Sequence, residues 1–212
     1  MSVTNLPEGF RFTPYADCNA AGGMAAYNWE ADPKRIAFQA ARYLTVAKLL
    51  EGKRRVLEVG CADGWGARIV RQHVANLDAI DIDESAIAIA EKNYSLRWPV
   101  FFLCADVLKT TFIGYDACYC LDLFEHLRDE AGLLARLAAI APICVIGTPS
   151  VEAQIYASEI SQREHVNCVS KSGLRDRMAK HWRHVFVLGM NDTTLHTGHD
   201  AMTHYLFGIG CN

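Results

Sequence analysis

The segment from Val56 to Gly66 constrains the fold of this chain more than any other part of its sequence. A short apolar run that includes the acidic residue Glu58 leads into a stretch with glycines at positions 60, 64 and 66. We predict a strand over 55–59, then a tight loop, then a helix that starts near Trp65. Glycine adopts backbone angles that other residues avoid, and it leaves room for a ligand to approach the main chain. The segment therefore predicts a nucleotide-binding loop between a strand and a helix.

Strand-like and helix-like segments alternate along the chain from residue 34 onward. Apolar residues at helical spacing predict helices over 34–50, 65–74, 85–94, 130–140 and 172–180. Short apolar runs predict strands over 55–59, 77–82, 100–104, 115–121, 143–146, 184–188 and 203–209. This alternation predicts an α/β fold with a mainly parallel sheet that helices cover on both faces. No helix separates the last two strands, which predicts a β-hairpin at one edge of the sheet.

Nothing in the sequence marks a second domain. A chain of 212 residues suits one buried core, and it contains no internal repeat or linker. We predict a single domain over 1–212, in which residues 1–50 form an N-terminal arm and a helix that pack over the site. Residues 1–33 are irregular but rich in aromatic side chains, which disordered tails usually lack. This segment is expected to pack on the body, either as a lid over the site or as a simple packing arm.

The composition argues against several classes of protein. A formal charge of -3 disfavours a protein that grips nucleic acid through phosphates. No apolar run approaches the roughly 18 to 20 residues that span a bilayer, and the first residues lack the pattern of a signal peptide. The eight cysteines show no Cys-x-x-Cys spacing, so we expect buried reduced thiols. We expect a cytoplasmic protein with a small-molecule partner, no membrane contact and no nucleic acid, and the sequence leaves the oligomeric state open.

Acidic residues follow three successive predicted strands. Asp81 lies 21 residues after Gly60 at the end of one strand, Asp106 lies just beyond the next, and Asp122 follows the one after that. In an open parallel sheet the carboxyl ends of the strands meet at one edge, where ligands bind. An isolated aspartate is usually a helix cap or a solvated loop residue. Three of them in this order predict that Asp81 binds ribose hydroxyls and that Asp106 lies beside a nucleoside base.

Together these residues resemble the class I S-adenosylmethionine-dependent methyltransferases. The family's first motif, acid-x-Gly-x-Gly-x-Gly, corresponds to residues 58–64, with Ala62 in place of the second glycine. Alanine is compatible with this loop if its φ stays negative. The resemblance implies a Rossmann-like, seven-stranded, mostly parallel sheet in the order 3-2-1-4-5-7-6, with helices on both faces and an antiparallel edge strand. An NAD-type Rossmann enzyme is the main alternative, but the glycine spacing is not Gly-x-Gly-x-x-Gly.

The resemblance also implies the cofactor, S-adenosyl-L-methionine, and the residues that hold it. These residues are Glu58, Gly60, Cys61, Ala62, Gly64, Asp81, Ile82, Asp106, Val107 and Leu121.

Several further segments resemble a bacterial methyltransferase subfamily that is commonly linked to capsule or other surface-polysaccharide synthesis. They include residues 32–35, 41–43, 147–150, 156–158, 165–167, 190–192, 196–198 and 202–205. This resemblance implies an acceptor that is a sugar or a sugar derivative. Fold-level likeness of this kind is an association and does not identify an acceptor chemically.

Candidate reactive groups cluster after the fourth and fifth predicted strands. Glu125 and His126 follow Asp122 by three and four residues, so one helical turn would place all three on one face. His165 follows the Gly-Thr-Pro-Ser loop at 147–150 and could reach the same place. We expect Glu125, His126 and His165 to be catalytic, because methyl transfer needs an aligned acceptor and a group that removes its proton. Asp122, His196 and Tyr27 are expected to contact the substrate.

The same cluster has three possible roles. Asp122, Glu125, His126 and His165 could hold a divalent cation such as Mg²⁺ or Mn²⁺, in a pattern similar to metal-dependent small-RNA 2′-O-methyltransferases. They could act as acids and bases without a metal. Alternatively, Asp122 could cap a helix with Glu125 reaching back, which is a structural role.

The sequence therefore predicts a methyltransferase that acts on a hydroxyl of a small sugar or sugar-phosphate acceptor. Two other functions stay open. One is methylation of RNA ends, and the other is a cofactor-binding subunit without catalysis.

Overall fold

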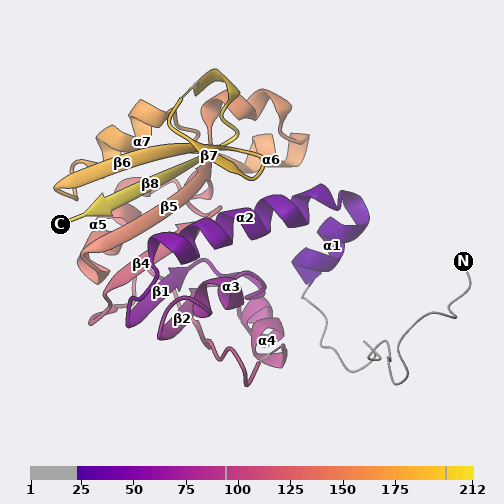
Figure 1. The fold of residues 1–212 in the computed structure, drawn as a ribbon, viewed down its shortest axis with the longest axis vertical. Helices are drawn as coiled ribbons and strands as arrows, with labels where there is room; N and C mark the ends of the chain where they lie inside the picture. Colours follow the sequence, from indigo (N-terminus) through magenta and orange to yellow (C-terminus); the bar gives the residue numbers. More distant parts are fainter. Residues whose placement is uncertain (1–22, 94, 199) are drawn as a thin grey trace, which may run out of the picture.

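The computed structural model describes residues 23–93, 95–198 and 200–212, and its centre is a single twisted sheet (Figure 1). Within these residues eight strands pair in the order β3-β2-β1-β4-β5-β8-β6-β7. The strands are β1 Arg55–Val59, β2 Asn76–Asp81, β3 Phe101–Cys104, β4 Ala117–Leu121, β5 Ile143–Pro149, β6 His184–Asn191, β7 Thr194–His196 and β8 Tyr205–Cys211. The first five strands pair in parallel, whereas β8 runs antiparallel to both β5 and β6.

The α-helices occupy the connections and the start of the described chain. They are α1 Gly23–Ala31, α2 Lys34–Leu49, α3 Ala67–Arg71, α4 Glu84–Lys92, α5 Glu130–Ile140, α6 Glu159–Glu164 and α7 Lys171–Met178. Short 3₁₀ turns lie at η2 Phe124–His126, η3 Val151–Tyr156 and η4 Asp200–Met202. None of the helices in the described part of the chain is long and apolar enough to cross a membrane.

The predicted α/β fold and its strand order are confirmed, with one additional strand. The short β7 pairs antiparallel with β6 through three residue pairs and forms the edge of the sheet. The two closing strands of the prediction are β6 and β8, which pair antiparallel, and β8 lies between β5 and β6 as the predicted order requires. The added strand β7 lies outside β6. The chain from β7 to β8 therefore crosses β6.

The N-terminal prediction was wrong for residues 23–31. They form helix α1, which contacts α2, instead of an irregular segment. The prediction of a packed arm or lid also concerns Phe10, Phe12 and Tyr15, and these three lie outside the described residues.

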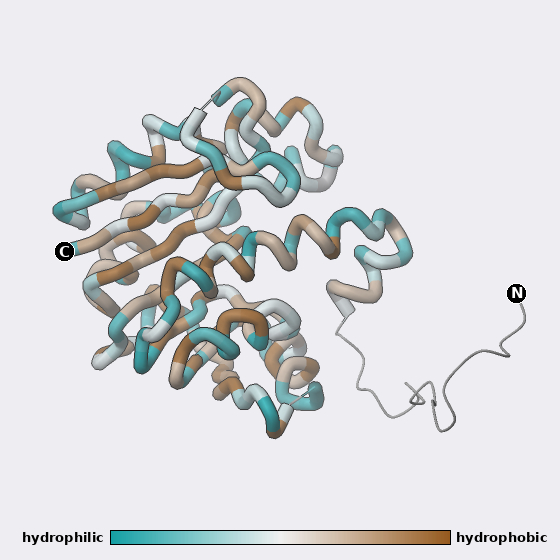
Figure 2. The backbone as a smooth tube through the Cα atoms, in the orientation of Figure 1, coloured by the Kyte–Doolittle hydropathy of each residue, from teal (hydrophilic) through white to brown (hydrophobic). Residues whose placement is uncertain are grey.

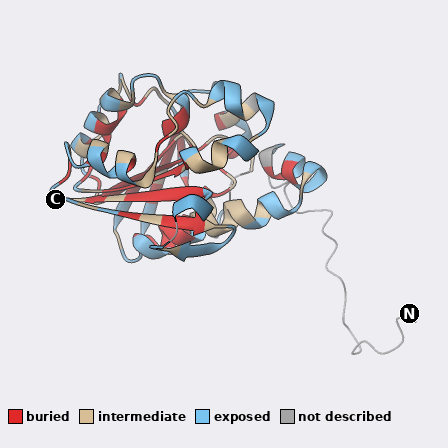
Figure 3. Ribbon diagram, turned by 90° about the horizontal axis from the view of Figure 1, so that it is seen from above, coloured by how far each residue is buried: buried red, intermediate tan, exposed pale blue. Residues whose placement is uncertain are grey.

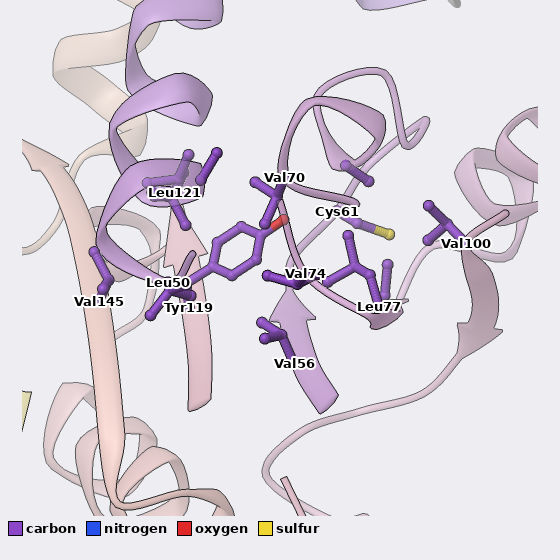
Figure 4. Close-up of a cluster of buried hydrophobic side chains, with 14 of the residues drawn as sticks. Leu50, Val56, Cys61, Val70, Val74, Leu77, Val100, Tyr119, Leu121 and Val145 are labelled. Atoms are coloured by element: carbon purple, nitrogen blue, oxygen red, sulfur yellow. The ribbon is translucent and has the colours of Figure 1, made fainter. Parts of the chain in front are cut away.

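Apolar side chains are buried on both faces of the sheet. Figure 3 shows the buried strands in red, with partly exposed helices around them. Successive residues of β1 alternate between the two cores: Val56 belongs to one, and Leu57 belongs to the other. The first core packs against α2 and α3, where the ring of Tyr119 lies among Leu50 and Val70 (Figure 4). The second packs against α5 and α7. Because both faces are covered, the central strands read as continuous apolar runs, which Figure 2 shows as hydrophobic colour along the sheet.

The cysteines follow the prediction of reduced thiols among the residues that the structure describes. Cys118, Cys120 and Cys144 are free and buried in the central strands. Cys104 was also predicted to be buried, but it lies exposed on β3. The reason is that β3 is an edge strand, and only Phe102 of its four residues is buried.

Candidate functional site

The loop after β1 is held by backbone hydrogen bonds to the neighbouring strand β2. The amides of Gly60 and Cys61 both donate to the carbonyl oxygen of Ile80 (2.8 and 3.0 Å). The amide of Ala62 donates to Oδ2 of Asp81 (2.8 Å). The carboxylate at the end of β2 therefore fixes the loop at the end of β1, besides facing the space where a ligand would lie.

Ala62 adopts a left-handed backbone conformation, with a φ of +46°. The condition under which alanine would suit this loop, a negative φ, is therefore not met. Gly60 and Gly64, two residues before and after it, also have positive φ values of +81° and +70°. The loop thus keeps the left-handed backbone at three alternate positions, although the middle one is an alanine and pays about 1 to 2 kcal/mol in steric strain for it.

Two of the glycines serve packing within the protein. A Cβ at Gly64 would lie 2.5 Å from the ring of Phe102, and one at Gly66 would lie 2.0 Å from the ring of Tyr43. The sequence prediction assigned the glycines to turning and to ligand approach. The structure shows that Gly64 and Gly66 also let β3 and α2 pack closely against the loop.

A first hollow of about 170 Å³ lies over the ends of β1, β2 and β3. It is lined by Gly60, Asp81, Ile82, Asp106 and Val107, among others. The side chain of Ile82 is 69% exposed there, which leaves a flat apolar surface beside two carboxylates. Lys109, at 2.9 Å, and the amide of Leu108 lower the pKa of Asp106, so its carboxylate stays ionised.

A second hollow of about 120 Å³ lies on the other side of Gly60. Cys61, Ala62 and Leu121 line it together with Gln39 and Tyr43 of α2, which the prediction did not include. Glu58 was predicted to face the cofactor, but it lies buried behind the loop, where its Oε1 accepts from the hydroxyl of Tyr43 (3.0 Å). Burial raises the pKa of Glu58 to about 7.

An ion pair between α2 and the end of β4 separates the second hollow from a third. Nη1 of Arg42 donates to both carboxylate oxygens of Asp122 (3.1 and 3.0 Å), and the guanidinium lies 3.9 Å from the ring centre of Tyr205. Burial alone would lower the pKa of Arg42, but the charge of Asp122 raises it, so the guanidinium stays charged. Asp122 has a φ of +52°, a second strained position beside the site.

The third hollow measures about 410 Å³ and is strongly polar. It lies between α1, α2, α6 and the ends of β4 and β5, and its lining includes Asn28, Arg35, Gln39, Arg42, Asp122, Glu125, His126 and His165. The second and third hollows share Gln39 and Asp122, and the first and second share Gly60. The three hollows therefore form one row along the carboxyl edge of the sheet.

Glu125, His126 and His165 come together at this third hollow. One possible ligand atom from each lies within 4.8 Å of the others, and the two imidazole rings are 5.0 Å apart. Backbone contacts bring His165 there, because the amides of Val166 and Asn167 donate to the carbonyl oxygen of Glu125 (2.8 and 3.0 Å).

The protonation of this cluster is set by its neighbours. Burial, followed by the charge of Asp122, raises the pKa of Glu125 to about 8, although Thr148 donates to its Oε2 (3.0 Å). Nδ1 of His126 lies 3.3 Å from the carbonyl oxygen of Glu164. Because a carbonyl oxygen can only accept a hydrogen bond, this contact places the hydrogen of the imidazole on Nδ1 and leaves the lone pair of Nε2 free. Nδ1 of His165 is bonded to the amide of Gln154.

Comparison with known proteins indicates the class to which this chain is similar. Residues 56–141 match a family model described as a methyltransferase domain. The match covers the glycine loop, Asp81, Asp106 and the Asp122 to His126 turn. The matched segment is about two fifths of the chain, and it supports an S-adenosylmethionine-dependent methyltransferase.

Relatives and solved structures agree with this assignment. An uncharacterised methyltransferase of Mycobacterium tuberculosis is 26% identical to this methyltransferase over 135 residues, which is 63% of this chain and 67% of the relative. A ubiquinone biosynthesis O-methyltransferase of Coxiella burnetii is 29% identical over 103 residues, 47% of this chain and 43% of the relative. The methyltransferase domain of bacterial CtHen1-C has the same fold, with a TM-score of 0.69 at 15% identity over 82% of this chain and 99% of the other.

Tyr27, His196 and Asp122 were expected to contact the substrate, and the structure shows other surroundings for them. Tyr27 is 63% exposed on α1 and lines none of the three hollows as the structure describes them, whereas its neighbour Asn28 lines the third. His196 lies on the edge strand β7, where its Nε2 is 3.0 Å from Oδ1 of Asn191. Asp122 lines the second and third hollows, but Arg42 engages its carboxylate, and it is not part of the Glu125, His126 and His165 group.

The predicted helical turn from Asp122 to His126 was wrong, and so was the capping alternative. Only residues 124–126 form a 3₁₀ turn, and its first flanking residue, Leu123, makes no side-chain cap. The N-cap of the next helix, α5, is Asp129, whose side chain accepts from the amide of Gly132.

The sequence reasoning missed Arg42, Thr148 and Gln154. Each acts on a residue far along the chain: Arg42 bonds Asp122 over 80 positions, Thr148 bonds Glu125 over 23, and Gln154 bonds His165 over 11. For Arg42 the available signal was a basic residue within an otherwise apolar helical pattern. The other two carried no signal in the sequence alone.

Proposed function

We propose that this protein transfers the methyl group of S-adenosylmethionine to a hydroxyl of a small polyhydroxyl acceptor, of the sugar or sugar-phosphate type. The adenosine would occupy the first hollow, the methionine part the second, and the acceptor the third. In this arrangement Asp81 and Asp106 bind the nucleoside, and the loop from Gly60 to Gly64 borders the methionine part.

The observation that carries the proposal is the convergence of Glu125, His126 and His165 on the hollow next to the proposed methionine site. Methyl transfer to a hydroxyl requires that the oxygen be aligned with the methyl group and that its proton be removed. Nε2 of His126 has the free lone pair that accepts this proton. Glu125, with a pKa of about 8, is protonated at neutral pH and can donate a hydrogen bond to the acceptor.

The rest of the third hollow supports a polyhydroxyl acceptor. The amides of Asn28 and Gln39 and the guanidinium of Arg35 line it, and Nδ2 of Asn28 donates to Oε1 of Gln39 (2.9 Å), so each amide has one of its two polar atoms engaged in this bond. Amides both donate and accept hydrogen bonds, as hydroxyl groups do, and a guanidinium can bind a phosphate. The sequence resemblance to methyltransferases linked to surface-polysaccharide synthesis points in the same direction, and from it we infer a role in capsule synthesis.

The test is transfer of labelled methyl groups from S-adenosylmethionine to a panel of sugars and sugar phosphates. The variant His126→Ala should lower kcat by about 100-fold or more, since general base catalysis contributes about 10²- to 10⁴-fold, and should leave cofactor affinity unchanged. The exposed His184→Ala, at the far end of β6, is the matched control. Equal rates for His126→Ala and the native protein would rule out this role for His126.

The cofactor half of the proposal has its own test. Asp81→Ala should weaken binding of S-adenosylmethionine by about 1.5 to 3 kcal/mol, the size of a hydrogen bond to a charged group. Calorimetry measures this loss directly. Unchanged affinity would remove Asp81 from the ribose site.

A metal-assisted version of the same reaction is favoured by one observation, the grouping of a carboxylate and two imidazoles within 4.8 Å. Two histidines and one carboxylate form a set that divalent metals such as Mn²⁺ and Fe²⁺ accept with open positions. Glu125, His126 and His165 would hold such an ion, which would lower the pKa of a bound hydroxyl. Asp122 does not fit this set because Arg42 holds its carboxylate.

Chelation decides between the two versions. If a metal takes part, EDTA should abolish methyl transfer, added Mn²⁺ or Mg²⁺ should restore it, and the purified protein should contain metal that Glu125→Gln lacks. Full activity in EDTA would favour acid–base chemistry without a metal.

A further inference from the structure

A fourth hollow of about 490 Å³ adjoins the third on the far side of His165. The two share Pro149, Ser161 and His165 in their walls, so they lie side by side along the end of β5. Apart from His165, the sequence analysis assigned no site residue to this hollow, and the methyl-transfer reaction as proposed above does not use the hollow itself.

The wall of the fourth hollow away from His165 is mainly apolar. Pro149, Ala153, Tyr156 and Ala157 contribute to it, and the Tyr156 side chain is 83% exposed. A large aromatic ring that is open to solvent beside a concave surface gains free energy when a ligand covers it.

The polar side chains of this hollow already have partners or lie at its rim. Gln154 is bonded to Nδ1 of His165, and His204 lies 3.7 Å from Oδ1 of Asp192 with half of its side chain exposed. The fourth hollow therefore offers few free hydrogen-bonding groups, and it has fewer charged side chains in its lining than the third.

We propose that the acceptor carries an apolar substituent, an alkyl or aromatic group joined to its hydroxyl-bearing head, and that this substituent occupies the fourth hollow. The inference rests on the proposed function, because it takes the third hollow as the place of the head. With the head against Glu125 and His126, a substituent that passes His165 and Ser161 enters the fourth hollow directly. Such an acceptor is a glycoside with an apolar group, not a free sugar.

The experiment compares the hexyl and methyl glycosides of each sugar in a panel that includes glucose, galactose and rhamnose. Calorimetry measures their binding to the protein saturated with S-adenosylhomocysteine. The hexyl glycoside should bind at least tenfold more tightly than the methyl glycoside of the same sugar. In methyl transfer the difference should appear in KM and leave kcat nearly unchanged.

Variants that fill the fourth hollow test whether the hexyl group binds there. Ala157→Trp should remove the preference for the hexyl glycoside, and the smaller change Ala153→Leu should reduce it in case Ala157→Trp does not fold. Ala88→Trp, at an exposed position on α4, is the matched control and should keep the preference. Cofactor binding by each variant confirms that it is folded.

Three outcomes would overturn the inference: equal binding of hexyl and methyl glycosides, a preference that survives both filling variants, or no binding of any hexyl glycoside. Methylation of free sugars without a hexyl preference would leave the proposed function standing and remove this inference alone. A hexyl preference in binding without any methyl transfer would instead contradict the proposed function.

Discussion

Two residues beside the site, Ala62 and Asp122, hold left-handed backbone conformations that cost free energy. For Asp122 the surroundings explain how the strain persists, because its amide donates to Gly147 and its carboxylate is held by Arg42. For Ala62 the hydrogen bond from its backbone amide to the carboxylate of Asp81 holds the strained conformation in place. Each strained residue is thus held by contacts from a different part of the chain.

Replacing Ala62 by glycine should relieve this strain. The left-handed conformation costs alanine about 1 to 2 kcal/mol, and glycine avoids this cost. Glycine loses more conformational entropy on folding, however, which offsets about 0.5 to 1 kcal/mol of the gain. Ala62→Gly should therefore raise the free energy of unfolding by up to about 1.5 kcal/mol, as measured by urea denaturation.

The control for Ala62→Gly is Ala88→Gly, in the middle of helix α4. There glycine should lower stability by about 1 kcal/mol, because it weakens a helix interior. If both changes destabilise the protein alike, Ala62 is not strained.

At the scale of elements, helix α2 connects the two halves of the site. Tyr43 packs over Gly66 and bonds Glu58 beneath the loop, while Arg42 reaches Asp122 after β4. The helix thereby fixes the glycine loop and the end of β4 relative to each other. Its apolar face, with Val46, Ala47 and Leu50, anchors it in the first core.

The close contact of α2 with the loop predicts a strong effect of Gly66→Ala. The added Cβ would lie 2.0 Å from the Tyr43 ring, and overpacking of this kind typically costs about 1 to 3 kcal/mol of stability. Gly198→Ala is the control, since a Cβ there meets nothing within 4 Å.

A double variant tests whether Tyr43 is the cause. If the clash is with the ring, Gly66→Ala should cost much less in a Tyr43→Ala background than in the native protein, in thermal or urea unfolding. Additive losses would place the strain elsewhere.

At the scale of the whole molecule, two buried glutamates make stability depend on pH. Burial raises the pKa of Glu58 to about 7 and, with the charge of Asp122, that of Glu125 to about 8, from an ordinary value of 4.5. A group whose pKa is higher in the folded state binds its proton more tightly there. Its contribution to stability is complete below about 4.5 and is lost as pH rises through 7 to 8.

We therefore expect the free energy of unfolding to fall between pH 5 and pH 8.5, by an amount of the order of 2 kcal/mol for each group. Glu125→Gln, which keeps an oxygen for Thr148, should flatten this decline, and Glu58→Gln should do so at slightly lower pH. Urea denaturation across the pH range measures both. A native profile that rises over this interval, or variants with the same slope as the native protein, would contradict the assignment.

The segments that the sequence placed well are those whose structure depends on neighbours along the chain. Strand β1 and helix α5 lie where the apolar pattern predicted them, and the β1–loop–α3 unit follows from a strand that ends in glycines. Asp81 and Asp106 could be predicted to lie at one edge because parallel strands bring their carboxyl ends together there, and both line the first hollow. The fold and the first hollow were therefore within reach of the sequence.

The tertiary structure alone decided the partners of the reactive groups. Arg42 meets Asp122 only because α2 crosses the end of β4, and His165 reaches Glu125 only because the chain after α6 hydrogen-bonds to its carbonyl oxygen. His196 lies on the edge strand β7 and lines none of the four hollows described above. The local sequence determined which residues end the strands, because periodicity and turn chemistry act over a few positions. Which charges meet across the site was decided by packing between elements tens of residues apart.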